Sequence, residues 1–106
     1  MIKTLFAVLL ISIASAVQAQ DEISITIKDH RFAPAEITIP ANQRVKLTVR
    51  NEDATPEEME SVDLNFEKII PGSEEGVIYI RPQNPGAYHF FGDFHQDTAQ
   101  GVINAR

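Results

Sequence analysis

The chain has 106 residues, no cysteine and a formal net charge of −6 at pH 7. This length suits one small domain. The absence of cysteine excludes disulfides, cysteine-ligated zinc, iron–sulfur clusters and blue copper. The acidic balance indicates a protein that does not bind nucleic acid, because phosphates require a basic face, and it suits cations or basic protein partners.

The first 19 residues have the pattern of a secretory signal peptide. Lys3 precedes an apolar run from Leu5 to Ile13, and small and polar residues follow up to Ala19. The apolar run is too short to span a bilayer comfortably. We predict cleavage after Ala19, which removes Lys3 and leaves a periplasmic domain of residues 20–106 that does not span the membrane.

Alternation of apolar and polar residues dominates the rest of the chain. Short runs of this kind, separated by Pro, Gly or Asn, are typical of an antiparallel β-sandwich. We expect one helical turn at most, in PEEMES (residues 56–61), because proline suits a first helical position and acids suit a helix N-terminus. The predicted strand segments are 23–27, 37–39, 45–49, 76–80 and 88–90.

Two stretches resemble cupredoxin-like domains. Residues 30–53, HRFAPAEITIPANQRVKLTVRNED, are similar to the opening half of such domains, and residues 85–103, PGAYHFFGDFHQDTAQGVI, are similar to the closing half. The resemblance covers about residues 22–105 and implies an all-β fold, a Greek-key β-sandwich. More narrowly, TPEEMES together with FGDFHQDTAQG is similar to the small periplasmic cupredoxins that accompany bacterial iron permeases.

The resemblance also places the family's metal ligands on this sequence. In blue-copper members, one histidine follows the strand that ends in Asn, and a cysteine, a second histidine and often a methionine come from the last loop. The cysteine position is Gly92 here, the second histidine is His95, the methionine position is Gln100, and the first histidine falls at or beside Glu57. Because no thiolate is present, we do not expect a blue-copper electron carrier.

The candidate metal ligands are His95, Glu57, Glu58, Met59 and Asp93. An imidazole with hard carboxylates suits iron or manganese, and a thioether would favour Cu(I). Each candidate also has a structural alternative. His95 could be a hydrogen-bonded loop residue, the glutamates a solvated loop, Met59 core packing and Asp93 a cap on the loop.

Three further polar residues have weaker claims. His89 is expected to point outward, because Tyr88 and Phe90 take the inward positions. His30 is expected to be structural and far from the closing loop. Gln100 could be a weak axial ligand or part of a hydrogen-bonded turn.

The resemblance implies a periplasmic metal-binding accessory protein for iron uptake, which handles Fe(II), or helps to oxidise it, before transport by an iron permease. Its partners would be that permease or other periplasmic iron-transport proteins. One alternative is a copper-binding chaperone or carrier that uses His95 and Met59, and another is a metal-free interaction module on a cupredoxin scaffold. The sequence contains no recognisable catalytic motif, which leaves a ferroxidase-type role open.

Overall fold

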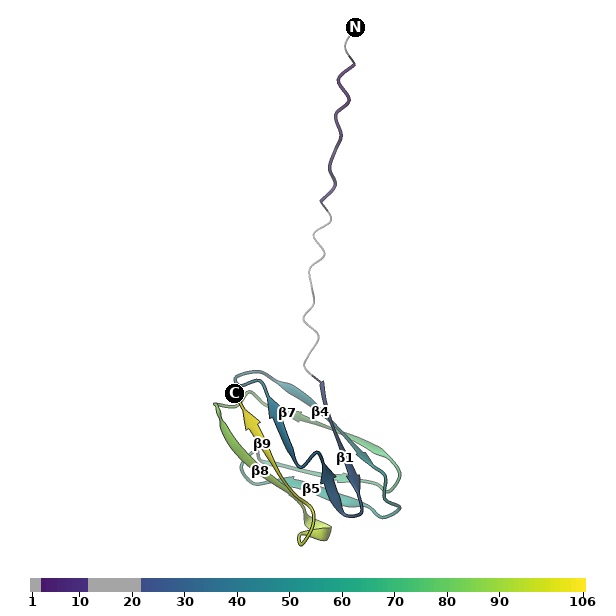
Figure 1. Cartoon of the computed structure of the whole chain (residues 1–106), viewed down its shortest axis with the longest axis vertical. Coiled ribbons are helices and arrows are strands. Elements are labelled where there is room, and N and C mark those ends of the chain that lie inside the picture. Colours follow the sequence, from purple (N-terminus) through teal and green to yellow (C-terminus); the bar gives the residue numbers. More distant parts are fainter. Residues whose placement is uncertain (1–2, 12–21) are drawn as a thin grey trace.

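The computed structural model describes residues 3–11 and 22–106 (Figure 1). Residues 3–11 are exposed and have no regular secondary structure. The predicted cleavage position after Ala19 lies outside the described residues, so cleavage stays a prediction. In the part of the chain that is described, no helix is long and apolar enough to cross a membrane.

Residues 22–106 form nine strands and one short 3₁₀ helix in two sheets. The bounds are β1 Glu22–Lys28, β2 Arg31–Ala33, β3 Glu36–Ile39, β4 Val45–Asn51, β5 Glu57–Ser61, β6 Phe66–Ile70, β7 Glu75–Ile80, β8 Gly86–Gly92, η1 Asp93–His95 and β9 Gln100–Ala105. The four-stranded sheet has the order β2-β1-β4-β7, and the five-stranded sheet has the order β3-β9-β8-β5-β6. The predicted all-β sandwich is confirmed.

The alternation had suggested an antiparallel sandwich, but two of the strand pairs are parallel. Strand β1 pairs with β4 in parallel, and β3 pairs with β9 in parallel, while the other pairs are antiparallel. Side-chain alternation is the same in both kinds of pairing, so the pattern of apolar residues predicts strands but not their relative direction.

The core lies between the two sheets, where the apolar positions of the strands face each other. Each buried aliphatic or aromatic side chain contributes about 1.5–3 kcal/mol relative to exposure. Phe32 and Phe90 meet edge to face with ring centroids 4.9 Å apart. The fully buried aliphatic residues include Ile25, Ile27, Val45, Leu47, Val49, Ile70 and Ile103.

The segment PEEMES is a strand, so the predicted helical turn is wrong. Strand β5 pairs with β6 and with β8, and the register places Met59 opposite Lys68 on one side and Gly92 on the other. An isolated helical turn satisfies few backbone groups for the residues that it orders. Pairing on both edges satisfies more of them, and tertiary context therefore overrides the local preference.

Three segments that are distant in the sequence meet at one end of the sandwich. The turn between β1 and β2, the start of β5 and the η1 segment after β8 lie at this end, and η1 projects beyond the sheets (Figure 1). The polar candidates of the sequence therefore lie around the end of the sandwich that η1 closes.

Candidate functional site

The alternation of β5 divides the five predicted metal ligands between two environments. Glu57 and Met59 point into the sandwich and are buried, whereas Glu58 points to the outer face and is half-buried. His95 lies beside Glu57, and Asp93 lies beside Glu58. We call Glu57 and His95 the inner pair, and Glu58, Glu60 and Asp93 the outer group.

The inner pair is closed on itself. The side chain of Glu57 is 1% exposed, and its Oε2 lies 2.5 Å from Nδ1 of His95. Its Oε1 accepts hydrogen bonds from the backbone N–H of Phe94, at 3.0 Å, and of Glu58, at 3.1 Å. A buried carboxylate needs such partners, because desolvation without them is costly. Both oxygens of Glu57 are therefore engaged by the protein's own donors.

The ring of His30 stacks on the ring of His95, with centroids 3.5 Å apart and planes inclined by 12°. The expectation that His30 lies far from the closing loop is therefore wrong. The hydroxyl of Thr98 also donates to the backbone carbonyl of His30 at 2.6 Å. These contacts join positions about 65 residues apart, which alternation within single strands does not reveal.

A strained two-residue turn presents the ring of His30 to this site. Asp29 and His30 have φ values of 52° and 57°, which non-glycine residues seldom adopt. The carboxylate of Asp53 accepts hydrogen bonds from the N–H of Asp29, at 2.8 Å, and of His30, at 3.0 Å. The hydrogen bond from the His30 N–H is the main cause that lowers the pKa of Asp53 below its ordinary value of 3.8, and the Asp29 N–H adds to it.

Met59 belongs to the hydrophobic core. Its side chain is fully buried among the core residues of both sheets. This environment supports the core-packing alternative for Met59.

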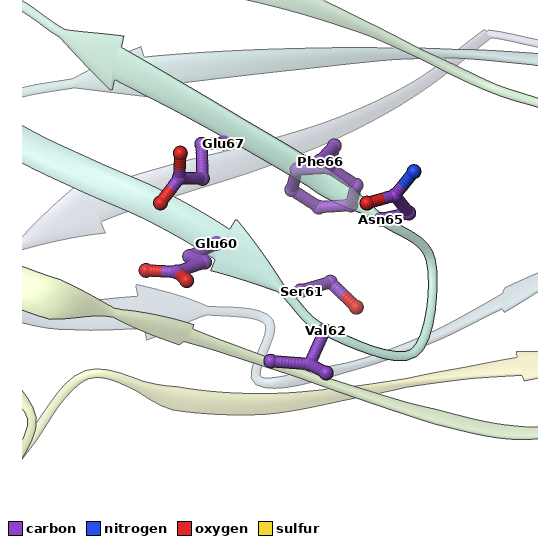
Figure 2. Close-up of a pocket in the computed structure, with 6 residues that line it drawn as sticks. All are labelled: Glu60, Ser61, Val62, Asn65, Phe66 and Glu67. Atoms are coloured by element: carbon purple, nitrogen blue, oxygen red, sulfur yellow. The ribbon is translucent and has the colours of Figure 1, made fainter.

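The outer group brings together three carboxylates on the outer face of the five-stranded sheet. One oxygen from each of Glu58, Glu60 and Asp93 lies within 4.8 Å of the other two. Glu67 joins them from β6, directly opposite Glu60. Figure 2 shows the carboxyl groups of Glu60 and Glu67 close to each other on neighbouring strands, where both line a pocket together with Ser61, Val62, Asn65 and Phe66.

These like charges oppose one another. Partial burial, followed by the neighbouring carboxylates of Glu67 and Asp93, raises the pKa values of Glu58 and Glu60 above their ordinary value. Asp93 accepts a hydrogen bond from the side-chain amide of Gln96 at 2.7 Å. Within residues 3–11 and 22–106, no basic side chain forms an ion pair with the outer group. Within the described residues, the electrostatic repulsion in the outer group is thus not relieved by an ion pair.

Glu60 was not among the candidate ligands, although it flanks Met59 together with Glu57 and Glu58. Glu58 and Glu60 are two positions apart, so on a strand they share a face. Glu67 could not be found in this way, because its place opposite Glu60 depends on the β5–β6 register.

His89 and Gln100 lie outside the inner pair. Both are exposed, and Nε2 of His89 lies 2.6 Å from Oε1 of Gln100. The amide of Gln100 donates to the carbonyl of Gln96 at 2.8 Å. The outward direction of His89 is confirmed, and Gln100 takes part in a hydrogen-bonded turn.

The residues at the family's copper position do not fit a blue-copper ion. No thiolate is available at Gly92, and a Cβ added there would lie 2.6 Å from Cδ of Glu57 and 2.7 Å from Cβ of Ala99. The space that a ligand side chain at position 92 would need is filled by the buried carboxylate. The nitrogen at Nδ1 of His95 is committed to the same carboxylate.

Comparison with known proteins agrees with this architecture. The profile of the cupredoxin-like domain family matches residues 1–105. An uncharacterized protein of Rickettsia prowazekii (strain Madrid E) is 50% identical over 82 residues, which cover 77% of this chain and 66% of that protein. The chain thus covers slightly less than two thirds of that relative's length.

Two solved structures illustrate the similarity of fold. Auracyanin A, a blue copper protein from Chloroflexus aurantiacus, superposes with a TM-score of 0.72 at 15% identity, over 83% of this chain and 100% of its own. The metal-binding domain of the Cu(I)-exporting P-type ATPase CopA of Streptococcus pneumoniae D39, solved with Cu(I), superposes with a TM-score of 0.68 at 20% identity, over 80% of this chain and 84% of its own. The chain belongs to the cupredoxin-like domain family.

Proposed function

We propose that this chain is an exported metal-binding accessory protein for iron uptake, and that it holds iron as cargo through the carboxylates of the outer group. The observation that supports the proposal is the convergence of Glu58, Glu60 and Asp93, with one oxygen of each within 4.8 Å of the others. Glu58 and Asp93 were candidates from the sequence, and Glu60 completes the group.

The chemistry of the donors favours a hard cation. Carboxylate oxygens suit iron or manganese, whereas copper is favoured by thiolate, thioether and imidazole groups. Partial burial, and then repulsion among the carboxylates, raises the pKa values of Glu58 and Glu60. A bound cation would relieve this repulsion. Oxygen donors also favour Fe(III) over Fe(II), so iron held here would be disposed to oxidation by dioxygen.

A copper carrier is the second candidate. It is favoured by the fold that this chain shares with auracyanin A, a blue copper protein, and with the CopA metal-binding domain, which was solved with Cu(I). The complete burial of Met59 counts against a site that joins this thioether to His95. The metal-free interaction module is the third candidate, and the self-contained inner pair is the observation in its favour.

Location and partners are part of the same proposal. Export rests on the signal-peptide pattern of residues 1–19, and a periplasmic iron permease or its companion as partner rests on the resemblance of TPEEMES and FGDFHQDTAQG to permease-associated cupredoxins. The acidic surface suits a partner with a basic docking face.

The test is calorimetric titration with Fe(II) under anaerobic conditions and, separately, with Cu(I). We expect Fe(II) to bind more tightly than about 0.1 mM, which corresponds to about −5.5 kcal/mol. Glu58→Gln, Glu60→Gln and Asp93→Asn should each weaken binding by roughly tenfold or more. Glu74→Gln is the matched control, because Glu74 is an exposed acid in the turn before β7. Absence of Fe(II) binding, or equal loss in the Glu74 variant, would contradict the proposal.

A further inference from the structure

The glycine at position 92 is required by space and not by backbone conformation. Its φ and ψ values are −96° and 112°, which any residue in a strand adopts. A Cβ there would nevertheless meet Cδ of Glu57 at 2.6 Å, Cβ of Ala99 at 2.7 Å and Oε1 of Glu57 at 2.8 Å. Two of the three closest atoms belong to Glu57, so a side chain at position 92 would force the buried carboxylate of Glu57, and Ala99 with it, to shift.

The carboxylate of Glu57 makes the connections that a metal would make at this end of the fold. It joins β5 to the η1 segment through the backbone N–H of Phe94 and through Nδ1 of His95. The face of the His95 ring is covered by His30, which Asp53 holds in place through its backbone N–H. The closing loop is therefore anchored to β5 and to the β1–β2 turn by the protein's own groups.

We infer that the inner pair takes the place of the cupredoxin metal in this chain, and that Gly92 and Glu57 depend on each other. Glycine at position 92 leaves the space that the carboxylate of Glu57 occupies. Glu57 fills the volume of the lost ligand at position 92 and binds the loop that the metal would bind. The end of the sandwich is then complete without an ion, and any metal that the protein handles binds elsewhere. This inference is independent of iron binding by the outer group.

The first experiment asks whether an ion stabilises the inner end. The full mature chain is prepared with Glu58→Gln, Glu60→Gln and Asp93→Asn, which remove the outer group, and is treated with a chelator. Urea unfolding is then measured with and without Cu(II) or Fe(II). A ligand that binds the folded state raises stability by mass action. We expect no rise in the urea midpoint with either ion. A rise that disappears on addition of His95→Gln would overturn the inference.

The second experiment tests the spatial conflict through alanine substitutions at two glycines. Gly86→Ala is the matched control, because a Cβ at that strand position would have its nearest contact, with the Tyr88 ring, at 3.8 Å. We expect Gly92→Ala to lower the urea midpoint much more than Gly86→Ala. If the two substitutions are tolerated equally, the dependence between Gly92 and Glu57 is refuted.

A double variant keeps this test decisive if Gly92→Ala folds poorly. We expect Gly92→Ala to cost less stability in the Glu57→Ala background than in wild type, because the nearest carboxylate atoms are then gone. If Gly92→Ala is as costly in the Glu57→Ala background as in wild type, the conflict lies with Ala99, and Glu57 is not the reciprocal partner.

Discussion

Glu57 and Glu58 are neighbours in the sequence but lie in opposite environments. The carboxylate of Glu57 is buried and accepts hydrogen bonds from two backbone N–H groups and from His95. The carboxylate of Glu58 faces outward, and partial burial, followed by repulsion from Glu67 and Asp93, raises its pKa. One step along a strand thus separates a group that holds the fold together from a group whose repulsion opposes the fold. The comparison indicates that the inner pair serves stability, while repulsion within the outer group acts against it.

The largest effect is expected from removal of the inner carboxylate. Glu57→Ala should lower the free energy of unfolding by about 3–5 kcal/mol, the range for breaking a buried pair by removing one partner. The loss arises because His95 and two backbone N–H groups are left without their acceptor. Urea unfolding measures it.

Glu57→Gln is the control for this variant, because it keeps the shape and one acceptor oxygen and should cost less. A loss below about 1 kcal/mol for Glu57→Ala, the size of one ordinary hydrogen bond, would show that the inner pair is not what stabilises this end.

A moderate effect is expected from replacement of the buried thioether. Met59→Leu conserves volume in the core and should cost less than about 1.5 kcal/mol. The Fe(II) and Cu(I) titrations should not change, because Met59 is fully buried. A selective loss of Cu(I) affinity would instead identify the thioether as a ligand and would support the copper carrier.

A smaller, pH-dependent effect is expected from Asp53. Its pKa is lowered in the folded state, so the unfolded chain takes up the proton first as the pH falls. The contribution of this carboxylate to stability is therefore fully present when the pH is above the ordinary pKa of 3.8. It is lost as the pH falls through the lower pKa of the folded state. The stability difference between wild type and Asp53→Asn should be constant between pH 5 and 7 and shrink towards pH 3. A difference that does not change with pH would contradict this account.

The smallest effect, of opposite sign, is expected in the outer group. The pKa of Glu60 is raised, so its ionised form is less favourable in the folded state than in the unfolded chain. Glu60→Gln should accordingly raise the urea midpoint at pH 7, and the gain should vanish as the pH falls through the raised pKa towards the ordinary value. Glu74→Gln should show no such gain. A lower midpoint for Glu60→Gln would mean that this carboxylate stabilises the fold.

Much of the fold could be predicted from local pattern. The alternation at 23–27 and 45–49 predicted strands that are now β1 and β4. The outward direction of His89 followed from the neighbouring aromatic residues. The parallel pairing of β1 with β4 and the strand at β5 could not be predicted in the same way, because they depend on which distant segment pairs with which edge.

The sequence by itself determined that a blue-copper centre is absent, since Gly92 supplies no thiolate whatever its surroundings. It also determined which residue types the closing loop itself contains. Only the tertiary structure decided which of those residues meet. It buried Glu57 against His95, brought His30 onto the same ring, and joined Glu60 to Glu58 and Asp93. The physical reason is that an acid's role depends on its partners, and partners tens of residues away are chosen by strand register and packing.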